Sequence, residues 1–488
     1  MKHFYSFLFF LVLSIPLFSQ SDIAKVKETI TQNEIEGHIY FLASDLLKGR
    51  ATGSAENKIA AQYLSSMFRS YGVATATALK DSYLQPVPLT KITKPSLTNF
   101  SVGAINTSEF VSVTRKNLSF DGDMTFMNYG LDKDYGKEIV TGKIVIAIAG
   151  SADKTDPRSA FSMLKKKREL AQSKGAIGLI EIMDTDTTTW KNLSHYLNRD
   201  KLTLDTHEKE DFVHGWIRFD SKVVRDDFKK NTLRKGTLTI KGITKKIVHS
   251  QNVVGIVEGT DPILKNEYII YSAHYDHVGI GEPVDNDSIY NGARDNAVGS
   301  VTVLAAAKNI AKYPTKRSAL FILFTGEEKG LLGSQYYVQH PVLPLHQMVY
   351  CFNSDNGGYN DTTLTTIIGL ERTTAAQDIK EAALAFGLKA IDDPAPEQGL
   401  FDRSDNVHFA SKGIPAPTFS MGFTAFDKEI TKYYHQVTDN PDTLDYPYLF
   451  KFFQSYVLAS RKIANNPKTP FWIKGDKYYN AGIELYKK

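Results

Sequence analysis

The sequence predicts an α/β fold, with strands and helices alternating along the second half of the chain. Three apolar runs have strand length, at residues 268–273, 319–324 and 348–352, and each is followed within a few residues by histidine or carboxylate side chains. Residues 297–311, after the first run, carry apolar side chains at helical spacing on a face that can pack on a sheet. In open α/β sheets the ligand crevice lies outside the carboxyl ends of the strands. These polar side chains are therefore expected to form one site.

The N-terminal part of the chain predicts two helices around a turn. Leu42, Leu46 and Leu47 face one way before a polar turn at residues 48–54, and apolar residues then recur at helical spacing over residues 59–68. Three prolines mark the exit from this part: Pro86, Pro88 and Pro95.

Residues 96–248 differ in sequence pattern from the rest of the chain, because short runs typical of β-strands dominate them. Residues 142–147 and 174–180 predict a strand, helix, strand unit, and the basic run at residues 165–168 is expected to be a solvated helix face. We find no metal-ligand spacing and no nucleophile motif there. The segment is best explained as a smaller non-catalytic domain inserted between residues 21–95 and 249–488.

A helix over residues 446–465 closes the chain's last domain, and an aromatic C-terminal tail is expected to pack on its body.

The composition is that of an ordinary globular protein, with 42% hydrophobic and 23% charged residues. The formal net charge is only +4, which argues against a nucleic-acid partner, because the basic face of such a protein normally dominates its charge. Cys351 is the only cysteine, so no intrachain disulfide can form. The oligomeric state is left open.

The first 20 residues predict a signal peptide. Lys2 gives the segment a positively charged start, and residues 7–18 form an apolar stretch that is too short to span a bilayer in the mature protein. Residues 19–21 are small or polar, as is usual where a signal peptide ends. We expect an exported protein, periplasmic or extracellular, with no stable membrane insertion after cleavage; an uncleaved anchor is the alternative. No later segment has the roughly 20 unbroken apolar residues of a membrane span.

The adjacent acids Glu327 and Glu328 follow the apolar run at residues 319–324 and are expected to divide two tasks. Consecutive side chains at a strand end point in different directions. We assign Glu328 to a metal and Glu327 to proton transfer as general base, beside a water whose pKa a zinc ion lowers. Taken alone, the pair would be two solvated loop acids.

His274 and Asp276 are two residues apart at a strand end, so their side chains are expected to share a face. The Asp276 carboxylate would accept the other ring proton of a ligating His274 and fix its tautomer. His277 competes with His274 as a ligand but is expected to point to the opposite face. Asp295 stands before a helix, where it could be a plain cap or a bridge between two ions. Asp355 and His435 complete a mixed oxygen and imidazole set without thiolate, which suits a zinc site that does chemistry.

Five stretches, in this order along the chain, resemble the motifs of the co-catalytic two-zinc aminopeptidase family, which includes secreted bacterial leucyl aminopeptidases and the glutamate carboxypeptidase II type. They are residues 272–276 (SAHYD), 292–297 (GARDNA), 324–334 (FTGEEKGLLGS), 353–355 (NSD) and 434–435 (YH). The resemblance covers about residues 30–95 and 250–465. It implies a zinc-exopeptidase fold, with a central mixed, mostly parallel sheet flanked by helices. The inserted segment resembles, more loosely, the protease-associated domain of these enzymes.

The resemblance also implies roles for single residues. His274 and Asp355 would hold one Zn²⁺, Glu328 and His435 the other, and Asp295 would bridge them through a cis peptide to Asn296. Glu327 would be the general base, Asp276 would orient His274, and Tyr434 is a candidate for stabilising the oxyanion. The chain departs from the family at Arg294, where an acid is usual, and at Val298, where a small polar residue is frequent. Cobalt or manganese could use the same ligands.

The function that follows is an exported metallo-exopeptidase acting on peptides, with an aminopeptidase as the leading prediction. A carboxypeptidase or dipeptidase of the same superfamily is the second candidate and would need a basic pocket for a substrate carboxylate. A glutaminyl-cyclase-like enzyme is disfavoured because such relatives lack the first metal histidine, which is present here as His274. A non-catalytic receptor is disfavoured because all five ligands and the base are present. A serine hydrolase is disfavoured because no Gly-x-Ser-x-Gly motif occurs.

Overall fold

The computed structural model describes residues 21–204, 211–229 and 231–487, so the expected signal peptide lies outside the described residues. The described residues form two compact units. Unit 1 joins the chain up to Pro86 with the chain from Ser250 onward, and unit 2 is Val87–His249. The chain passes between them on β1 (Leu84–Ile92) and β11 (Lys245–Val257). No helix among the described residues combines the length and apolar character needed to cross a bilayer.

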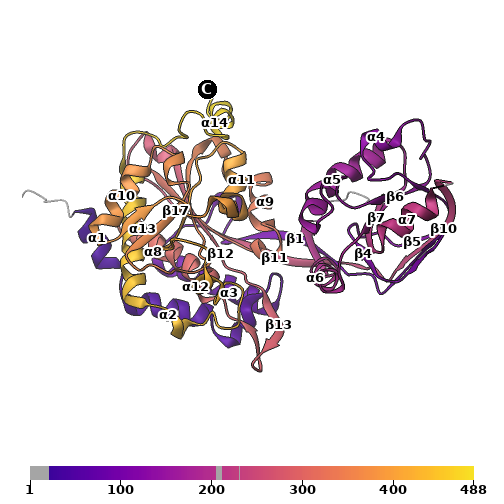
Figure 1. Ribbon diagram of the computed structural model, residues 1–488. Helices are drawn as coiled ribbons and strands as arrows, with labels where there is room; N and C mark the ends of the chain where they lie inside the picture. Colours follow the sequence, from indigo (N-terminus) through magenta and orange to yellow (C-terminus); the bar gives the residue numbers. More distant parts are fainter. Residues whose placement is uncertain (1–20, 205–210, 230, 488) are drawn as a thin grey trace, which may run out of the picture. The chain divides into compact units, whose positions relative to one another are not determined.

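A mixed sheet forms the centre of unit 1 (Figure 1). Its three central strands are parallel: β16 (Met348–Ser354), β12 (Tyr268–His274) and β15 (Ser318–Phe324). The three apolar runs predicted as strands are confirmed, and β15 and β16 are buried along their whole length, as parallel strands covered on both faces are. Further strands of unit 1 extend this sheet on both sides: β19 (Thr418–Met421), β17 (Leu364–Ile368) and β18 (Lys389–Ile391) beyond β16, and β11 and β1 beyond β15.

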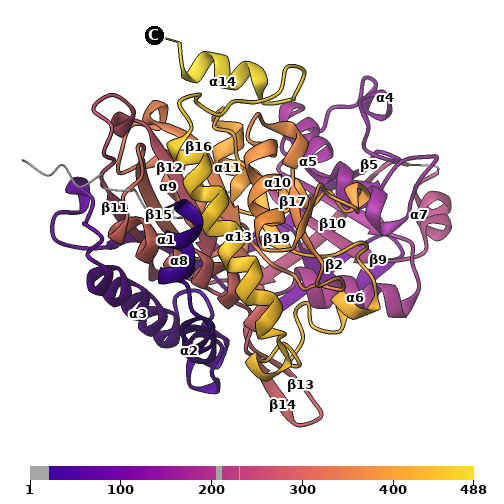
Figure 2. The ribbon, with the colours of Figure 1, turned by 90° about the vertical axis from the view of Figure 1, so that its left-hand side faces the viewer.

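Alternate residues of these strands pack into two separate cores, because successive side chains on a strand point to opposite faces. Phe321 and Leu323 belong to one core, and Leu320 and Ile322 to the other. The first core is covered by α1 (Asp22–Thr29), α2 (Gln32–Leu42), α3 (Ala55–Tyr71), α8 (Gly299–Lys312), α10 (Ala376–Ala385) and α13 (Tyr446–Asn465). In Figure 2, α13 runs across this face beside α1 and α8. The second core is covered by α9 (Leu332–Gln339), α11 (Asn406–Ser411), α12 (Lys428–Thr431) and the C-terminal segment with α14 (Tyr479–Leu485).

The aromatic tail packs on the body as expected, since Trp472 is buried in the second core and its Nε1 donates to the Gly413 carbonyl at 2.9 Å. The predicted N-terminal helices are also present, as α2 and α3. Between them lies a short 3₁₀ segment, η1 (Asp45–Arg50), in which Gly49 has φ +64°. A Cβ there would lie 2.3 Å from the Tyr290 carbonyl oxygen, so only glycine lets this turn approach the hairpin of β13 (Gly279–Val284) and β14 (Asp287–Tyr290).

The described residues of unit 2 form an eight-stranded sheet. The predicted strand, helix, strand unit is confirmed as β6 (Ile144–Ile148), α5 (Pro157–Ser173) and β7 (Gly178–Met183), with the two strands parallel. The other strands are β2 (Leu97–Val102), β3 (Ile105–Thr107), β4 (Phe110–Ser112), β5 (Leu118–Phe126), β9 (Val213–Arg218) and β10 (Leu233–Lys241), while β8 (Lys201–Leu204) pairs with β1. The other helices are α4 (Asp132–Tyr135), α6 (Thr187–Leu197) and α7 (Ser221–Phe228).

The basic run on α5 is only partly the solvated face that was expected. Lys167 is fully buried and its Nζ is paired with the buried Glu181, which also accepts from Trp216 Nε1 at 3.0 Å and lies 2.7 Å from His214 Nε2. A helix turns by 100° per residue, so one of four consecutive side chains faces the sheet. The prediction that this unit is a protease-associated domain stays a prediction.

Candidate metal centre

The carboxyl ends of the parallel strands bring the predicted ligands to one edge of the sheet. His274 is the last residue of β12, Glu327 and Glu328 follow β15, and Asp355 follows β16 directly. Because the three strands are parallel neighbours, their ends lie together. Asp295 comes from the turn before α8, and His435 from the loop after α12.

The first group of neighbouring ligand atoms belongs to His274, Glu327 and Asp355. His274 Nε2 lies 3.3 Å from Asp355 Oδ1, 3.3 Å from Asp295 Oδ1 and 3.9 Å from Glu327 Oε2. The His274 side chain is 1% exposed, so these carboxylates are held against it away from bulk solvent.

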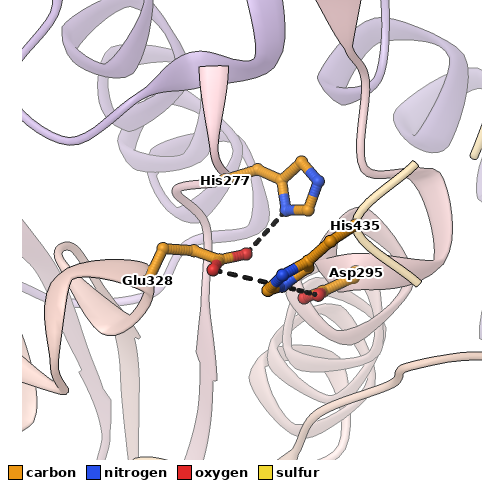
Figure 3. A group of neighbouring side chains, drawn as sticks. All are labelled: His277, Asp295, Glu328 and His435. Atoms are coloured by element: carbon orange, nitrogen blue, oxygen red, sulfur yellow. Dashed lines mark ion pairs between the residues drawn. The ribbon is translucent and has the colours of Figure 1, made fainter. Parts of the chain in front are cut away.

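The second group belongs to His277, Asp295, Glu328 and His435 (Figure 3). His435 Nε2 lies 3.1 Å from Asp295 Oδ2 and 3.2 Å from Glu328 Oε2, and His277 Nδ1 lies 2.8 Å from Glu328 Oε1. Asp295 therefore faces the first group with Oδ1 and the second with Oδ2. All five predicted ligands and the predicted base come together.

The expectation that His277 points away from the site is wrong. Strand β12 ends at His274, and the chain then leaves the extended pairing before His277 forms an isolated parallel bridge with Ala51. The alternation of faces along a strand does not continue past the strand end, so spacing could not place this side chain.

Asp276 contacts His274 differently from the prediction. His274 Nδ1 lies 3.1 Å from the backbone carbonyl oxygen of Asp276, whereas the Asp276 carboxylate is 3.9 Å away. That carboxylate instead accepts from Thr52 Oγ1 at 2.7 Å and from the Glu327 backbone N–H at 3.2 Å. Its side chain thus fixes the backbone that carries Glu327, and its orienting role toward His274 stays a prediction.

Two residues that sequence reasoning did not single out hold the Asp295 turn. Arg50, fully buried, donates to the backbone carbonyls of Tyr275 (2.7 Å), Leu42 (2.9 Å) and Gly292 (2.7 Å), and also to those of Asn291 and Asp295. Asp439, also buried, accepts from the backbone N–H groups of Arg294 (3.0 Å) and Asp295 (3.2 Å). The expected cis peptide between Asp295 and Asn296 is present.

Arg294, the departure from the family pattern, is paired away from the ligand groups. Its Nη1 donates to Asp439 Oδ1 at 3.1 Å, and its guanidinium lies 3.6 Å from the ring centroid of Tyr433. Because Tyr433 and Asp439 flank His435 in sequence, Arg294 ties the turn of Asp295 to the loop of His435.

The pKa shifts at the centre follow from burial and crowded charge. Burial raises the pKa of the Glu327 carboxyl well above its ordinary value; the charge of His274 opposes this, and Asp355 reinforces it. Burial disfavours the charged form of His274, but the carboxylates of Glu327 and Asp355 outweigh it and hold the His274 pKa well above its usual value. So many buried carboxylates in contact are costly unless cations compensate them. The imidazole and carboxylate donors fit zinc, which is bound by both in proteins.

A cavity of about 110 Å³ opens beside the ligands. Its wall carries apolar side chains, among them Phe423 and Ile430, and polar ones, among them Tyr434 and Arg403. The Tyr434 ring stacks on His435 with centroids 4.2 Å apart, and its oxygen accepts from Arg403 Nη2 at 3.3 Å. The cavity can therefore take a partly apolar ligand with a polar group next to the ligand atoms.

Residues 252–458 match the model of "Peptidase family M28". Among curated proteins, Aminopeptidase YwaD of Bacillus subtilis (strain 168) is 29% identical over 214 residues, 42% of this chain and 43% of that protein. A probable leucine aminopeptidase 2 of Aspergillus oryzae is 36% identical over 89 residues, 18% of this chain and 16% of that protein. The matches span less than half the length of these relatives.

Among solved structures, an aminopeptidase from Aneurinibacillus sp. strain AM-1 has a TM-score of 0.62 at 21% identity, covering 92% of this chain and 97% of that one. BSAP, a zinc aminopeptidase from Bacillus subtilis, has a TM-score of 0.52 at 18% identity, with the same coverage. At such identities the likeness shows a shared fold. The expected zinc-exopeptidase fold, with its mixed sheet and flanking helices, is confirmed.

Proposed function

We propose that this chain, which belongs to peptidase family M28 through residues 252–458, is an exported aminopeptidase that removes N-terminal residues from peptides with two zinc ions. The observation that carries the proposal is the position of Asp295. Its two carboxylate oxygens each face a histidine of a different ligand group, at 3.3 Å from His274 and 3.1 Å from His435. One carboxylate shared by two groups is what a pair of bridged ions needs.

In this proposal the ligands divide as the sequence resemblance implies. His274 and Asp355 would hold one ion, Glu328 and His435 the other, and Asp295 both. When bound, the ions would polarise the carbonyl of the scissile bond and lower the pKa of a coordinated water toward neutrality.

Glu327 is the group that moves the proton. It takes the proton of the attacking water and passes it to the amine that leaves. Its carboxylate stands 3.9 Å from His274 Nε2, beside the first ligand group, and its backbone N–H is held by the Asp276 carboxylate. Burial raises the pKa of the Glu327 carboxyl, which makes its carboxylate a stronger base than that of an exposed glutamate.

Tyr434 is proposed to stabilise the oxyanion. Arg403 donates to its oxygen, so the Tyr434 hydroxyl keeps its own hydrogen for donation into the cavity, and the stacked His435 fixes the ring. The apolar walls from Phe423 and Ile430 would take the substrate side chain. Bound this way, an N-terminal residue would place its carbonyl beside the ligands.

One observation favours a second candidate, a carboxypeptidase or dipeptidase. Arg403 lines the cavity and is the kind of cation that a substrate carboxylate requires. Export, the signal peptide at residues 1–20 and the protease-associated nature of unit 2 belong to the proposal and rest on sequence pattern alone.

The test is hydrolysis of a panel of aminoacyl-4-nitroanilides by the purified chain, with and without chelator, beside Glu327→Gln. Glu282→Gln, an exposed acid on β13, is the matched control. We expect cleavage of free-amine substrates that both chelator and Glu327→Gln abolish and that the control retains.

Cleavage restricted to N-blocked peptides with a free carboxylate would favour the second candidate. Absence of both cleavage and bound metal would overturn the proposed function in either form.

A further inference from the structure

His277 makes a contact with Glu328 that no part of the proposed mechanism uses. Its Nδ1 lies 2.8 Å from Glu328 Oε1, and the His277 side chain is 0% exposed. Within the described residues, the two ring nitrogens of His277 and the Oε1 atom of Glu328 make no well-aligned hydrogen bond, although Nδ1 and Oε1 are close enough for one. Buried polar atoms without partners are uncommon and need a cause.

The His277 Nδ1 and Glu328 Oε1 atoms form a close ion pair, and both also lie near the ligand atoms of Asp295 and His435. Figure 3 shows the His277 ring, the Glu328 carboxylate and the His435 ring arranged around the same space, with Asp295 beside them. One ligand atom from each lies within 4.8 Å of all the others. Two donors that each lie about 2.0–2.2 Å from the same zinc ion are at most about 4.4 Å apart. Side-chain shifts of about 0.5 Å or less would therefore let all four donors reach one ion.

The backbone is shaped to hold His277 in this position. A Cβ on Gly292, which has φ +62°, would lie 2.5 Å from His277 Cδ2, so the imidazole occupies space that any other residue at 292 would fill. On the other side, Ala51 bridges to His277, and Arg50 next to it holds the Tyr275 carbonyl. The ring faces that of His435 with centroids 5.6 Å apart and planes at 69°. The position of His277 is therefore fixed from three sides.

We propose that His277 is a fourth protein ligand, through Nδ1, for the ion held by Asp295, Glu328 and His435. This rests on the proposed function, since it requires an ion in that group. The two metal positions then differ in kind. The His277 position has four protein donors, the number typical of zinc sites that retain their ion. The other position has three, His274, Asp355 and Asp295, because Glu327 beside them is assigned to proton transfer, and it keeps room for water and substrate.

The competing explanation is that His277 only orients Glu328 by a hydrogen bond once an ion is bound. Loss of such an outer partner costs about 10–100-fold in metal affinity. Loss of a direct ligand should exceed that range and should also remove one imidazole from the coordination of the ion. The two explanations therefore differ in a spectroscopic signature as well as in affinity.

The experiment compares the full-length wild-type chain with His277→Asn and His277→Ala, using apoprotein titrated with Co²⁺ and with Zn²⁺ against a competing chelator. His340→Asn, an exposed histidine on unit 1, is the matched control. Proton NMR of the Co²⁺-loaded proteins counts the shifted, exchangeable ring N–H signals, one from each coordinated imidazole. Circular dichroism and hydrogen exchange before loading select variants that fold.

We expect ring N–H signals from His274, His277 and His435 in wild type and control, and one signal fewer in both His277 variants. One of the two ions should bind more than about 100-fold more weakly in the variants. This loss of affinity exceeds the loss expected when a residue that only orients a ligand is removed. An unchanged signal count, or a loss of affinity within 100-fold, would overturn the ligand role of His277 while leaving the proposed function intact. A wild-type chain that binds no metal would instead overturn both.

Discussion

Replacement of Arg50 by methionine is expected to destabilise unit 1 by at least about 3 kcal/mol. The side chain is fully buried and donates to the carbonyls of Leu42, Tyr275, Asn291 and Gly292, with a longer contact to that of Asp295. Methionine fills a similar length without donors. Each buried carbonyl left unpaired costs about 1–3 kcal/mol. The Gly292 carbonyl keeps the Ala297 N–H as a donor at 3.2 Å, so three carbonyls are left unpaired and cost about 3–9 kcal/mol, and water entering the site brings the result toward the lower end. Whole domains are stable by only about 5–15 kcal/mol.

The same substitution should weaken metal binding as well as lower the stability of unit 1. Arg50 holds the carbonyls on either side of the turn that presents Asp295, so its loss releases the bridging carboxylate. Arg50→Lys keeps the charge and up to three donors and should recover part of both losses, but not the fork that spans several carbonyls. Arg69→Met, an exposed arginine on α3, is the matched control.

The assay is hydrogen exchange with mass spectrometry across a urea series, which reports the two units separately and makes unit 2 an internal reference. Zn²⁺ affinity is measured in parallel. A loss below about 1 kcal/mol for Arg50→Met, with wild-type Zn²⁺ affinity, would refute the reasoning, because it would mean that these carbonyls do not need the guanidinium.

Three further predictions concern buried charge and bound metal. Lys167 and His214 outweigh burial and lower the Glu181 pKa from 4.5 to about 2, so its contribution to stability is complete above about pH 4.5 and is lost as the pH falls through 2. Glu181→Gln should destabilise unit 2 by about 3–5 kcal/mol at pH 7 and flatten this acid dependence in urea titrations; equal acid slopes in both proteins would contradict it. Arg294→Met should cost unit 1 about 3–5 kcal/mol because Asp439 stays buried without its cation, and adding Asp439→Asn should recover part of this in a double-mutant cycle; additive losses would argue against the pair. Removal of metal by chelator should lower the calorimetric midpoint of unit 1 but not of unit 2, because an ion present at 1,000 times its Kd stabilises the folded state by about 4 kcal/mol; equal shifts would exclude a site confined to unit 1.

The strands and the ligands at their ends could be predicted from sequence because both depend on local pattern. Strand β15 is an unbroken apolar run, as a strand covered on both faces must be, and Glu327 and Glu328 follow it directly. The same holds for His274 at the end of β12 and for the turn that precedes α8.

The supporting residues could not be predicted, because their partners are distant in sequence and mostly backbone. Arg50 donates to backbone carbonyls more than 200 residues away, and every residue type carries such a carbonyl, so the sequence does not mark these partners. Asp439 looks like any loop acid until Arg294 and the Asp295 backbone surround it. His277 was misplaced because strand periodicity was extended beyond the end of its strand. Lys167 belongs to a basic run whose average character conceals one buried member.

The division of unit 1 into two segments has a consequence for the order of events as the chain is synthesised. Residues up to Pro86 emerge first, yet the sheet on which α2 and α3 pack follows only after all of Val87–His249. Within unit 2 the two ends of that stretch already meet, since the Thr93 N–H donates to the Thr244 carbonyl at 3.0 Å. If this unit forms first on the ribosome, it shortens the loop that the early segment must close and saves on the order of 2 kcal/mol of closure entropy. Unit 2 would then assist the maturation of the metal centre without contributing a ligand to it.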